Sequence, residues 1–144
     1  MAQGFTADWG KALNEAISND ADFKEKIAKF GKTVMAKISP SPEHGVTEEI
    51  VFGFDFDNFE YYFGEGQAFY DTVDYVFEGD YESWYNVNED IKGLVPSMMD
   101  ESVEVTKGSV SYVARFLPAI ERYFWLSRSV TDSYAGDFKP VAAR

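Results

Sequence analysis

The stretch EIVFGFDFD, Glu49 to Asp57, constrains the fold of this chain more than any other stretch. Large apolar side chains occupy every second position in it, at Ile50, Phe52, Phe54 and Phe56. Successive side chains of a β-strand point to opposite faces of the sheet, so these four share one face. The pattern therefore predicts a strand whose apolar face must be covered by a second layer of structure.

Two helices are expected before this strand. Apolar residues of the range 5–17 recur at spacings of three and four around a candidate N-cap at Thr6. A second, shorter helix can be capped by Asp20 or Asp22, and its inner side carries Phe23, Ile27 and Phe30. From Lys32 the apolar period changes to two, which indicates that the sheet begins there.

Four further strands are expected, at Lys32–Ser39, Phe59–Phe63, Phe69–Glu78 and Ser102–Thr106. Turn residues join the middle ones, so the centre of the chain is predicted to be an antiparallel meander. Asp80 is a candidate N-cap for a short helix, and LVPSMMD predicts another. The expected fold class is α+β, with about five strands in a mostly antiparallel sheet covered by the N-terminal helices and a long apolar C-terminal helix.

The range Val110–Val130 predicts that long helix, beginning after Ser109 and bent by Pro118. Its apolar stripe runs through Val113, Phe116, Leu117, Ile120 and Phe124. A helix apolar over so wide an arc must be buried on more than one side, or must face something other than protein. Small residues, Gly and Pro follow, so we expect one domain at residues 1–130 and a loosely packed tail at residues 131–144.

Composition limits the classes of function. The 144 residues carry a formal net charge of -12, which repels nucleic acid and anionic membranes, so no nucleic-acid partner is expected. No apolar run approaches ~20 residues, so no transmembrane segment is expected. The start, MAQGFTADWG, lacks the regions of a signal peptide, and we expect a cytoplasmic location. Aromatic residues make up 17% of the chain, which indicates a bulky core or a pocket walled by rings.

Candidate catalytic groups are few. There is no Cys, and we expect the single histidine, His44 in the loop SPSPEHGV, to be an exposed residue without a catalytic role. Asp55 and Asp57 share one strand face, but no calcium-loop motif surrounds them, which favours a solvated face followed by a turn. We therefore expect no metal, no cofactor and no catalytic residue.

Asp71 offers the main catalytic alternative. In the strand Phe69–Glu78 it shares the inward phase, whereas Asp74 points outward. A buried Asp of raised pKa beside a tyrosine hydroxyl can move a proton next to a carbonyl, as in folds of the ketosteroid isomerase kind. The candidate tyrosines are Tyr70, Tyr75 and Tyr112. An Asp71 that lies in water at the strand edge is the competing interpretation.

From Tyr75 the chain reads YVFEGDYESWYNVNEDIKGLVPSMMDESVEVTKGSV. In order, this stretch holds a strand, an acidic cap with a short helix, Gly93, a helix with the pair Met98-Met99, a Val-rich strand and Gly108. That order, and the order of elements over nearly the whole chain, resembles the sterol carrier protein 2-like family.

The resemblance implies an α+β sandwich whose sheet and C-terminal helices enclose an apolar tunnel for sterols, fatty acyl chains or similar lipids. On the helical side it implies a lining of Trp84, Met98, Met99, Phe116, Leu117, Ile120 and Phe124. On the sheet side it implies Phe52, Phe54, Tyr75 and Phe77. The expected function is non-catalytic binding or carriage of a hydrophobic small molecule, which makes this ligand the main expected partner.

Two other non-catalytic interpretations stay open. The aromatic and methionine residues can simply form a plain core. Alternatively, the chain is a partner domain that forms a homodimer or docks on a lipid-handling enzyme. The interface would then use exposed side chains of the last helix, namely Tyr123, Trp125 and Leu126.

Overall fold

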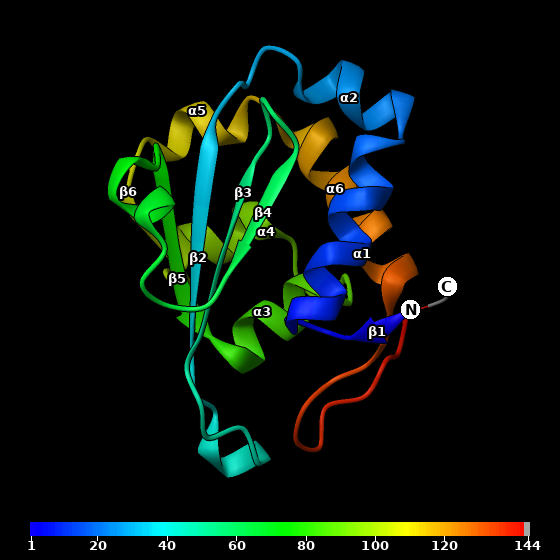
Figure 1. The fold of residues 1–144 in the computed structure, drawn as a ribbon. Coiled ribbons are helices and arrows are strands. Elements are labelled where there is room, and N and C mark those ends of the chain that lie inside the picture. Colours follow the sequence, from blue (N-terminus) through cyan, green and yellow to red (C-terminus); the bar gives the residue numbers. More distant parts are fainter. Residues whose placement is uncertain (143–144) are drawn as a thin grey trace.

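The computed structural model describes residues 1–142, and within them six α-helices cover one face of a five-stranded sheet (Figure 1). The sheet strands are β2 (Thr33–Ser39), β3 (Ile50–Asp55), β4 (Glu60–Phe63), β5 (Tyr75–Asp80) and β6 (Val103–Lys107). The helices are α1 (Ala7–Ser18), α2 (Ala21–Ile27), α3 (Tyr81–Asn88), α4 (Leu94–Met99), α5 (Val110–Ala114) and α6 (Leu117–Val130). The predicted α+β class is confirmed.

The strand order of the sheet is β4-β3-β2-β5-β6. Three of its four neighbouring pairs are antiparallel, as predicted, and β2 with β5 is parallel. The predicted meander is therefore correct from β2 to β4 and wrong at β5. The connection from Gly64 to Asp74 carries the chain from β4, at one edge of the sheet, to the far side of β2, where β5 pairs with it in parallel.

Side-chain caps begin four of the helices as the sequence indicates. The Thr6 hydroxyl accepts from the backbone N–H of Trp9, and the Asp20 carboxylate accepts from that of Phe23. Asp80 and Ser109 cap α3 and α5 in the same way. Of the two candidate caps for the second helix, the structure uses Asp20.

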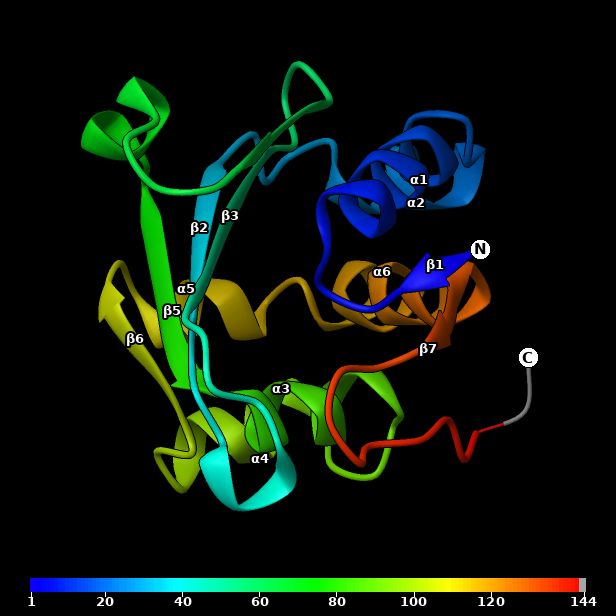
Figure 2. The same cartoon turned by 60° about the horizontal axis from the view of Figure 1, so that its bottom comes forward.

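The strand predicted at Phe69–Glu78 is only half formed. Residues Ala68–Thr72 make a 3-10 helix, η2, and β5 begins at Tyr75. The η2 segment packs on the sheet face opposite the α-helices, where Phe69 and Tyr70 join a small cluster of Met35, Val51 and Val73 (Figure 2). The alternation of apolar residues before Tyr75 thus marks contacts of a turn with the sheet.

The single long helix predicted at Val110–Val130 is two helices. α5 ends at Ala114, and α6 begins at Leu117 with Pro118 in its first turn. Proline is tolerated there because the first backbone N–H groups of a helix have no partner inside the helix. Pro118 therefore starts a helix, where a bend within one had been predicted.

The segment after α6 is packed, which corrects the prediction of a loose tail for the residues described. Strand β7 (Thr131–Ser133) pairs in parallel with β1 (Ala2–Gln3), so the two ends of the domain lie together (Figure 1). Tyr134 and Phe138 are buried, and the Phe138 ring contacts Tyr81 and Tyr85 of α3. Residues 143–144 of the predicted tail lie outside the described residues.

Candidate functional site

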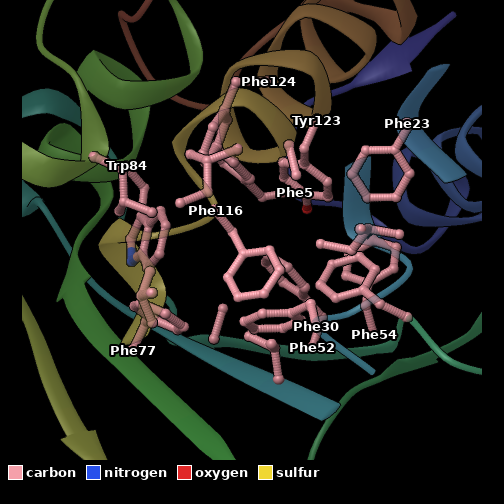
Figure 3. A pocket seen from close by; sticks show the side chains of 18 of the residues that line it. Phe5, Phe23, Phe30, Phe52, Phe54, Phe77, Trp84, Phe116, Tyr123 and Phe124 are labelled. Carbon is pink, nitrogen blue, oxygen red and sulfur yellow. The ribbon is translucent and has the colours of Figure 1, made fainter. Parts of the chain in front are cut away.

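An apolar cavity lies between the sheet and the helices (Figure 3). The space inside it that is open to the centre of a water-sized sphere is about 90 Å³. One water needs roughly 10–15 Å³ on that measure, so the space admits several waters or a slim apolar group. Each of the six α-helices contributes at least one lining side chain, and none of the lining residues is charged.

The floor of the cavity follows from the register of three strands. Ala36 on β2 is paired with Phe52 on β3 and with Phe77 on β5. Paired residues point to the same face of the sheet, so a small side chain sits between two large rings. Ala36 therefore leaves a depression in the centre of the floor, and all three residues line the cavity.

The helices supply the roof and the ends. Phe23 of α2 lies at one end and Trp84 of α3 at the other (Figure 3), and Trp9 of α1 also lines the cavity. The α5–α6 junction brings Phe116 inward, where its ring contacts that of Phe30 at a centroid distance of 5.0 Å. The break between the two helices is thus part of the wall.

Seven of the eleven side chains expected to line a tunnel surround this cavity. They are Phe52, Phe54, Phe77, Trp84, Phe116, Ile120 and Phe124. Three of these lie on the sheet side and four on the helical side.

The other four lie elsewhere. Met99 and Leu117 are 78% and 42% exposed, so the expectation that they line a tunnel is wrong for both. Met99 is the last residue of the short helix α4, whose inner side carries Met98, while Leu117 points outward as the first residue of α6. Met98 and Tyr75 are buried in the core beside the cavity, and the Tyr75 ring stacks on Phe30.

The N-terminal helices contribute lining that the family resemblance did not point to. Phe5, Trp9, Phe23, Ile27 and Phe30 all face the cavity. The helical spacing of these residues predicted their burial correctly, but spacing does not show which part of a core a buried residue faces. Tyr123 was also assigned to the surface, whereas its ring packs against Phe23, Phe54 and Phe56.

Three polar groups reach the lining. The indole N–H of Trp9 donates to Thr131 Oγ1 at 3.1 Å, and that of Trp84 donates to the Lys37 carbonyl at 3.4 Å. The third group is the hydroxyl of Tyr123, whose pKa is raised by burial and, to a smaller degree, by the nearby Tyr61. At neutral pH the cavity is therefore uncharged as well as apolar.

A comparison with solved structures finds matches over most of the chain. A crystal structure of sterol carrier protein 2 has a TM-score of 0.74 at 20% sequence identity, covering 88% of this chain and 98% of that one. A solution structure of a conserved hypothetical protein from Thermus thermophilus, described as possibly a sterol carrier protein, has a TM-score of 0.76 at 19% identity. The match covers 96% of this chain and 100% of that one. The solution structure of the sterol carrier protein domain 2 of Helicoverpa armigera has a TM-score of 0.60 at 13% identity. The match covers 85% of this chain and 91% of that one.

This chain has the sterol carrier protein 2 fold. The family resemblance noted in the residues after Tyr75 is thus confirmed at the level of the fold. No protein-family model matches the chain, and no curated protein matches it in sequence.

In this sterol carrier protein 2-like fold, the residues of the proton-transfer alternative do not meet. Asp71 lies exposed in η2, so its predicted inward position is wrong. Asp74 is exposed as predicted, and its carboxylate accepts from the backbone N–H and hydroxyl of Thr33, both at 3.2 Å. Tyr70 lies on the opposite sheet face from the cavity and donates to the Gly64 carbonyl. Among the described residues, no carboxylate lines the apolar cavity, so the alternative lacks its general base there.

Asp55 has a structural role in the turn after β3. Its carboxylate accepts from the backbone N–H groups of Asp57 and Asn58, at 2.9 and 3.0 Å. Partial burial raises the pKa of Asp55, but these hydrogen bonds outweigh that effect and hold the pKa below its usual value. The carboxylate is thus occupied by the turn, as the favoured interpretation had it.

His44 is more than an exposed loop residue. Its side chain is 34% exposed, and its ring lies between two carboxylates from distant segments. Nε2 is 2.6 Å from Glu82 of α3, and Nδ1 is 3.1 Å from Asp137 of the C-terminal segment. Glu43 also lies beside it. The cluster joins the loop after β2, helix α3 and the C-terminal segment through charge.

Tyr123, Trp125 and Leu126, the three residues expected to form a homodimer interface, do not lie on one exposed surface. Leu126 is buried and Tyr123 faces the cavity, so only Trp125, at 52% exposure, fits the expectation. The Arg122 guanidinium lies 4.3 Å from the Trp125 ring centroid and covers part of the ring.

Among residues 1–142, no helix combines the length and the apolar character needed to cross a bilayer.

Proposed function

We propose that this protein binds a hydrophobic small molecule in the cavity between its sheet and its helices, and carries that molecule without changing it chemically. The observation that carries the proposal is an uncharged, almost wholly apolar space enclosed by every α-helix of the fold. Apolar cavities of this kind stay dry and take up apolar ligands, because burying apolar surface is favourable.

The shared fold supports the chemical class of the ligand. One structure with the same fold carries the name sterol carrier protein 2, which describes a protein that carries a sterol. The ring-walled cavity of this chain offers large apolar contact surfaces, which are the surfaces that a lipid or sterol-like molecule would contact. The absence of a carboxylate, a charged residue or a histidine from the described lining supports carriage over catalysis.

The test uses Ala36, whose small side chain forms the depression in the floor. Ala36→Ile adds three carbon atoms to the cavity side of β2 and keeps a residue that strands favour. Met35→Ile is the matched control, because Met35 is the neighbouring residue and packs on the opposite sheet face. Binding of the neutral fluorescent probe N-phenyl-1-naphthylamine is measured for both variants and for the wild type.

We expect saturable binding of about one probe per wild-type chain. Ala36→Ile should weaken it by roughly tenfold or more, with an unchanged or higher melting temperature, because the isoleucine fills space that the probe needs. Met35→Ile should bind within about twofold of the wild type. Binding that is not saturable, or that both variants weaken equally, contradicts the proposal.

A further inference from the structure

Tyr123 brings a hydroxyl into the cavity. Its ring extends from α6 between the rings of Phe54, Phe56 and Phe124, and its oxygen points into the space between the sheet and the helix (Figure 3). Among the described side chains that line the cavity, Tyr123 is the sole one with an oxygen atom. Within residues 1–142 no group forms a hydrogen bond with this hydroxyl, whereas both indole N–H groups of the lining have acceptors.

A tyrosine hydroxyl that lines an apolar cavity and has no protein partner is unusual, because native proteins pair nearly all polar groups that lie away from bulk water. Tyr61 is close enough to influence the pKa of Tyr123, but its own hydroxyl donates to the Thr6 carbonyl at 3.4 Å. The Tyr123 oxygen is therefore free to bond to a molecule inside the cavity. A ligand with a hydrogen-bonding atom at this point satisfies a group that is otherwise costly to bury.

The charge of that ligand atom follows from the surroundings. Burial raises the pKa of Tyr123, so its hydroxyl stays protonated and acts as a neutral donor. No lining residue carries a charge that would pair with a carboxylate or an ammonium group. Arg122, the cation next to it in the chain, donates to both carboxylate oxygens of Asp20, at 2.9 and 2.7 Å. A charged group inside the cavity would lose its hydration without compensation.

We infer that the ligand of the cavity carries an uncharged oxygen, as an alcohol, a ketone or an ester does, and that this oxygen accepts a hydrogen bond from the Tyr123 hydroxyl. The inference rests on the proposed function and narrows it. It selects neutral lipids with a small polar group over free fatty acids in their anionic form. It also sets the orientation, with the polar group inside the protein next to α6.

Three ten-carbon ligands test this inference at pH 8 through displacement of N-phenyl-1-naphthylamine. 1-Decanol has a neutral oxygen, 1-chlorodecane has no useful acceptor, and decanoate is anionic. They are titrated against the wild type and Tyr123→Phe, which removes the hydroxyl and keeps the ring. Tyr112→Phe is the control, because the Tyr112 hydroxyl donates to the Lys29 carbonyl outside the cavity.

The wild type should bind 1-decanol at least about tenfold more tightly than decanoate, since the cavity cannot pair the charge. Tyr123→Phe should weaken 1-decanol binding by about tenfold and leave 1-chlorodecane within about twofold. Tyr112→Phe should change neither. If 1-decanol binds equally to the wild type and to Tyr123→Phe while 1-chlorodecane still binds, the inference is wrong and the proposed function survives. If no ligand displaces the probe from the wild type, the proposed function itself fails.

A second measurement does not depend on any variant. The carbonyl stretching frequency of 2-decanone bound to the wild type reports whether its oxygen accepts a hydrogen bond. We expect a frequency below that of 2-decanone in hexane, because a donor hydroxyl weakens the carbonyl bond. A frequency equal to that in hexane would show a carbonyl without a donor and would overturn the inference.

Discussion

Gly10 in α1 lies against the ring of Tyr61 on β4. A Cβ atom added at Gly10 would lie 1.7 Å from Tyr61 Cζ and 2.0 Å from its hydroxyl oxygen. Helix propensity alone favours alanine over glycine by about 1 kcal/mol. Because the two atoms cannot approach so closely, the close packing of β4 on α1 depends on glycine at this position.

We predict that Gly10→Ala lowers the free energy of unfolding by about 1–3 kcal/mol, because the overpacked ring must move. Chemical denaturation measures the loss. In a Tyr61→Ala background, where the ring is absent, the same change should be neutral or should stabilise by up to about 1 kcal/mol. An equal loss in both backgrounds would contradict a steric cause.

The sequence predicts some single-residue roles and hides others. The caps at Thr6, Asp20, Asp80 and Ser109 are local, because each side chain bonds to a backbone N–H three residues later. The role of Gly10 depends on a ring from a distant strand, and no local pattern contains that information. The same reason explains why the sequence does not predict the burial of the Tyr123 ring. Its ring neighbours are Phe23 of α2, Phe54 of β3 and Phe56 just after β3, all distant in the sequence.

At the scale of elements, Asp20 joins two helices. Its carboxylate caps α2 by accepting from the Phe23 N–H at 2.8 Å, and it also accepts two hydrogen bonds from Arg122 on α6. The hydrogen bond from Arg122 is the largest cause that holds the pKa of Asp20 below its usual value. α2 and α6 both line the cavity, so this ion pair fixes two parts of its wall.

Two variants separate the two roles of Asp20. Asparagine caps helices about as well as aspartate, so Asp20→Asn removes the ion pair and keeps the cap. Asp20→Ala removes both and should lower the free energy of unfolding by about 1 kcal/mol more than Asp20→Asn does. Equal losses in chemical denaturation would show that the cap contributes nothing.

The ion pair also predicts a pH dependence. A carboxylate whose pKa is lowered in the folded state adds stability above its ordinary value of 3.8, and that stability is lost as the pH falls through the lowered pKa. The difference in stability between the wild type and Asp20→Asn should therefore be largest near neutral pH and shrink below about pH 4. Thermal unfolding from pH 2.5 to pH 7 checks this, and a difference that grows on acidification would contradict it.

The elements themselves were predictable where their pattern is long or capped. α1, β3 and the capped starts of α2, α3 and α5 follow from spacing and from cap residues. The η2 turn was not predictable, because Phe69 and Val73 stand at every-second-residue spacing with Tyr75 and Phe77, as in a strand. In the structure, Phe69 and Val73 pack on one face of the sheet, whereas Tyr75 and Phe77 of β5 pack on the other. Short apolar runs do not distinguish a strand from a turn that contacts a sheet.

At the scale of the whole molecule, the C-terminal segment is tied to the domain next to the cavity-lining helix α3. The backbones of Gly136 and His44 meet so closely that a Cβ at Gly136 would lie 2.1 Å from the His44 carbonyl oxygen. The Asp137 N–H donates to that same carbonyl at 2.9 Å. His44 then adds its contacts with Asp137 and Glu82, which completes a link between three distant segments.

This link should respond to pH. Partial burial lowers the pKa of His44, but the hydrogen bond with Asp137 and the negative charges of Asp137, Glu82 and Glu43 outweigh it, so the pKa is raised. The link therefore stabilises the fold fully below the ordinary value of 6.5 and loses this contribution as the pH rises through the raised pKa.

We predict that His44→Gln lowers the melting temperature at pH 5.5 and has a smaller effect at pH 8.5. The difference from the wild type at each pH isolates His44, because the other titrating groups are common to both proteins. Asp137→Asn is the control and should weaken the same pH dependence. A His44→Gln effect that is flat with pH, or larger at pH 8.5, would contradict a protonated link.

The whole-molecule features depend on contacts that sequence patterns do not encode. Tyr134 and Phe138 are two rings in a segment rich in small residues, and both are buried in contact with Tyr85 of α3, which lies far away in the sequence. The cavity was expected because of the family resemblance, which pointed to seven of its lining residues. Periodicity alone identified the same residues as buried and left open whether they enclose a space or fill it.

The most direct test of the central claim, that the space between sheet and helices holds an apolar ligand, is a crystal structure with bound 1-bromodecane. Anomalous scattering locates the bromine atom without reference to the protein coordinates. We predict an anomalous peak inside the cavity, among the side chains of Ala36, Phe52 and Ile120. Bromine found only on the surface, with the aromatic rings closed over a filled interior, would contradict the account and would make these residues a plain core.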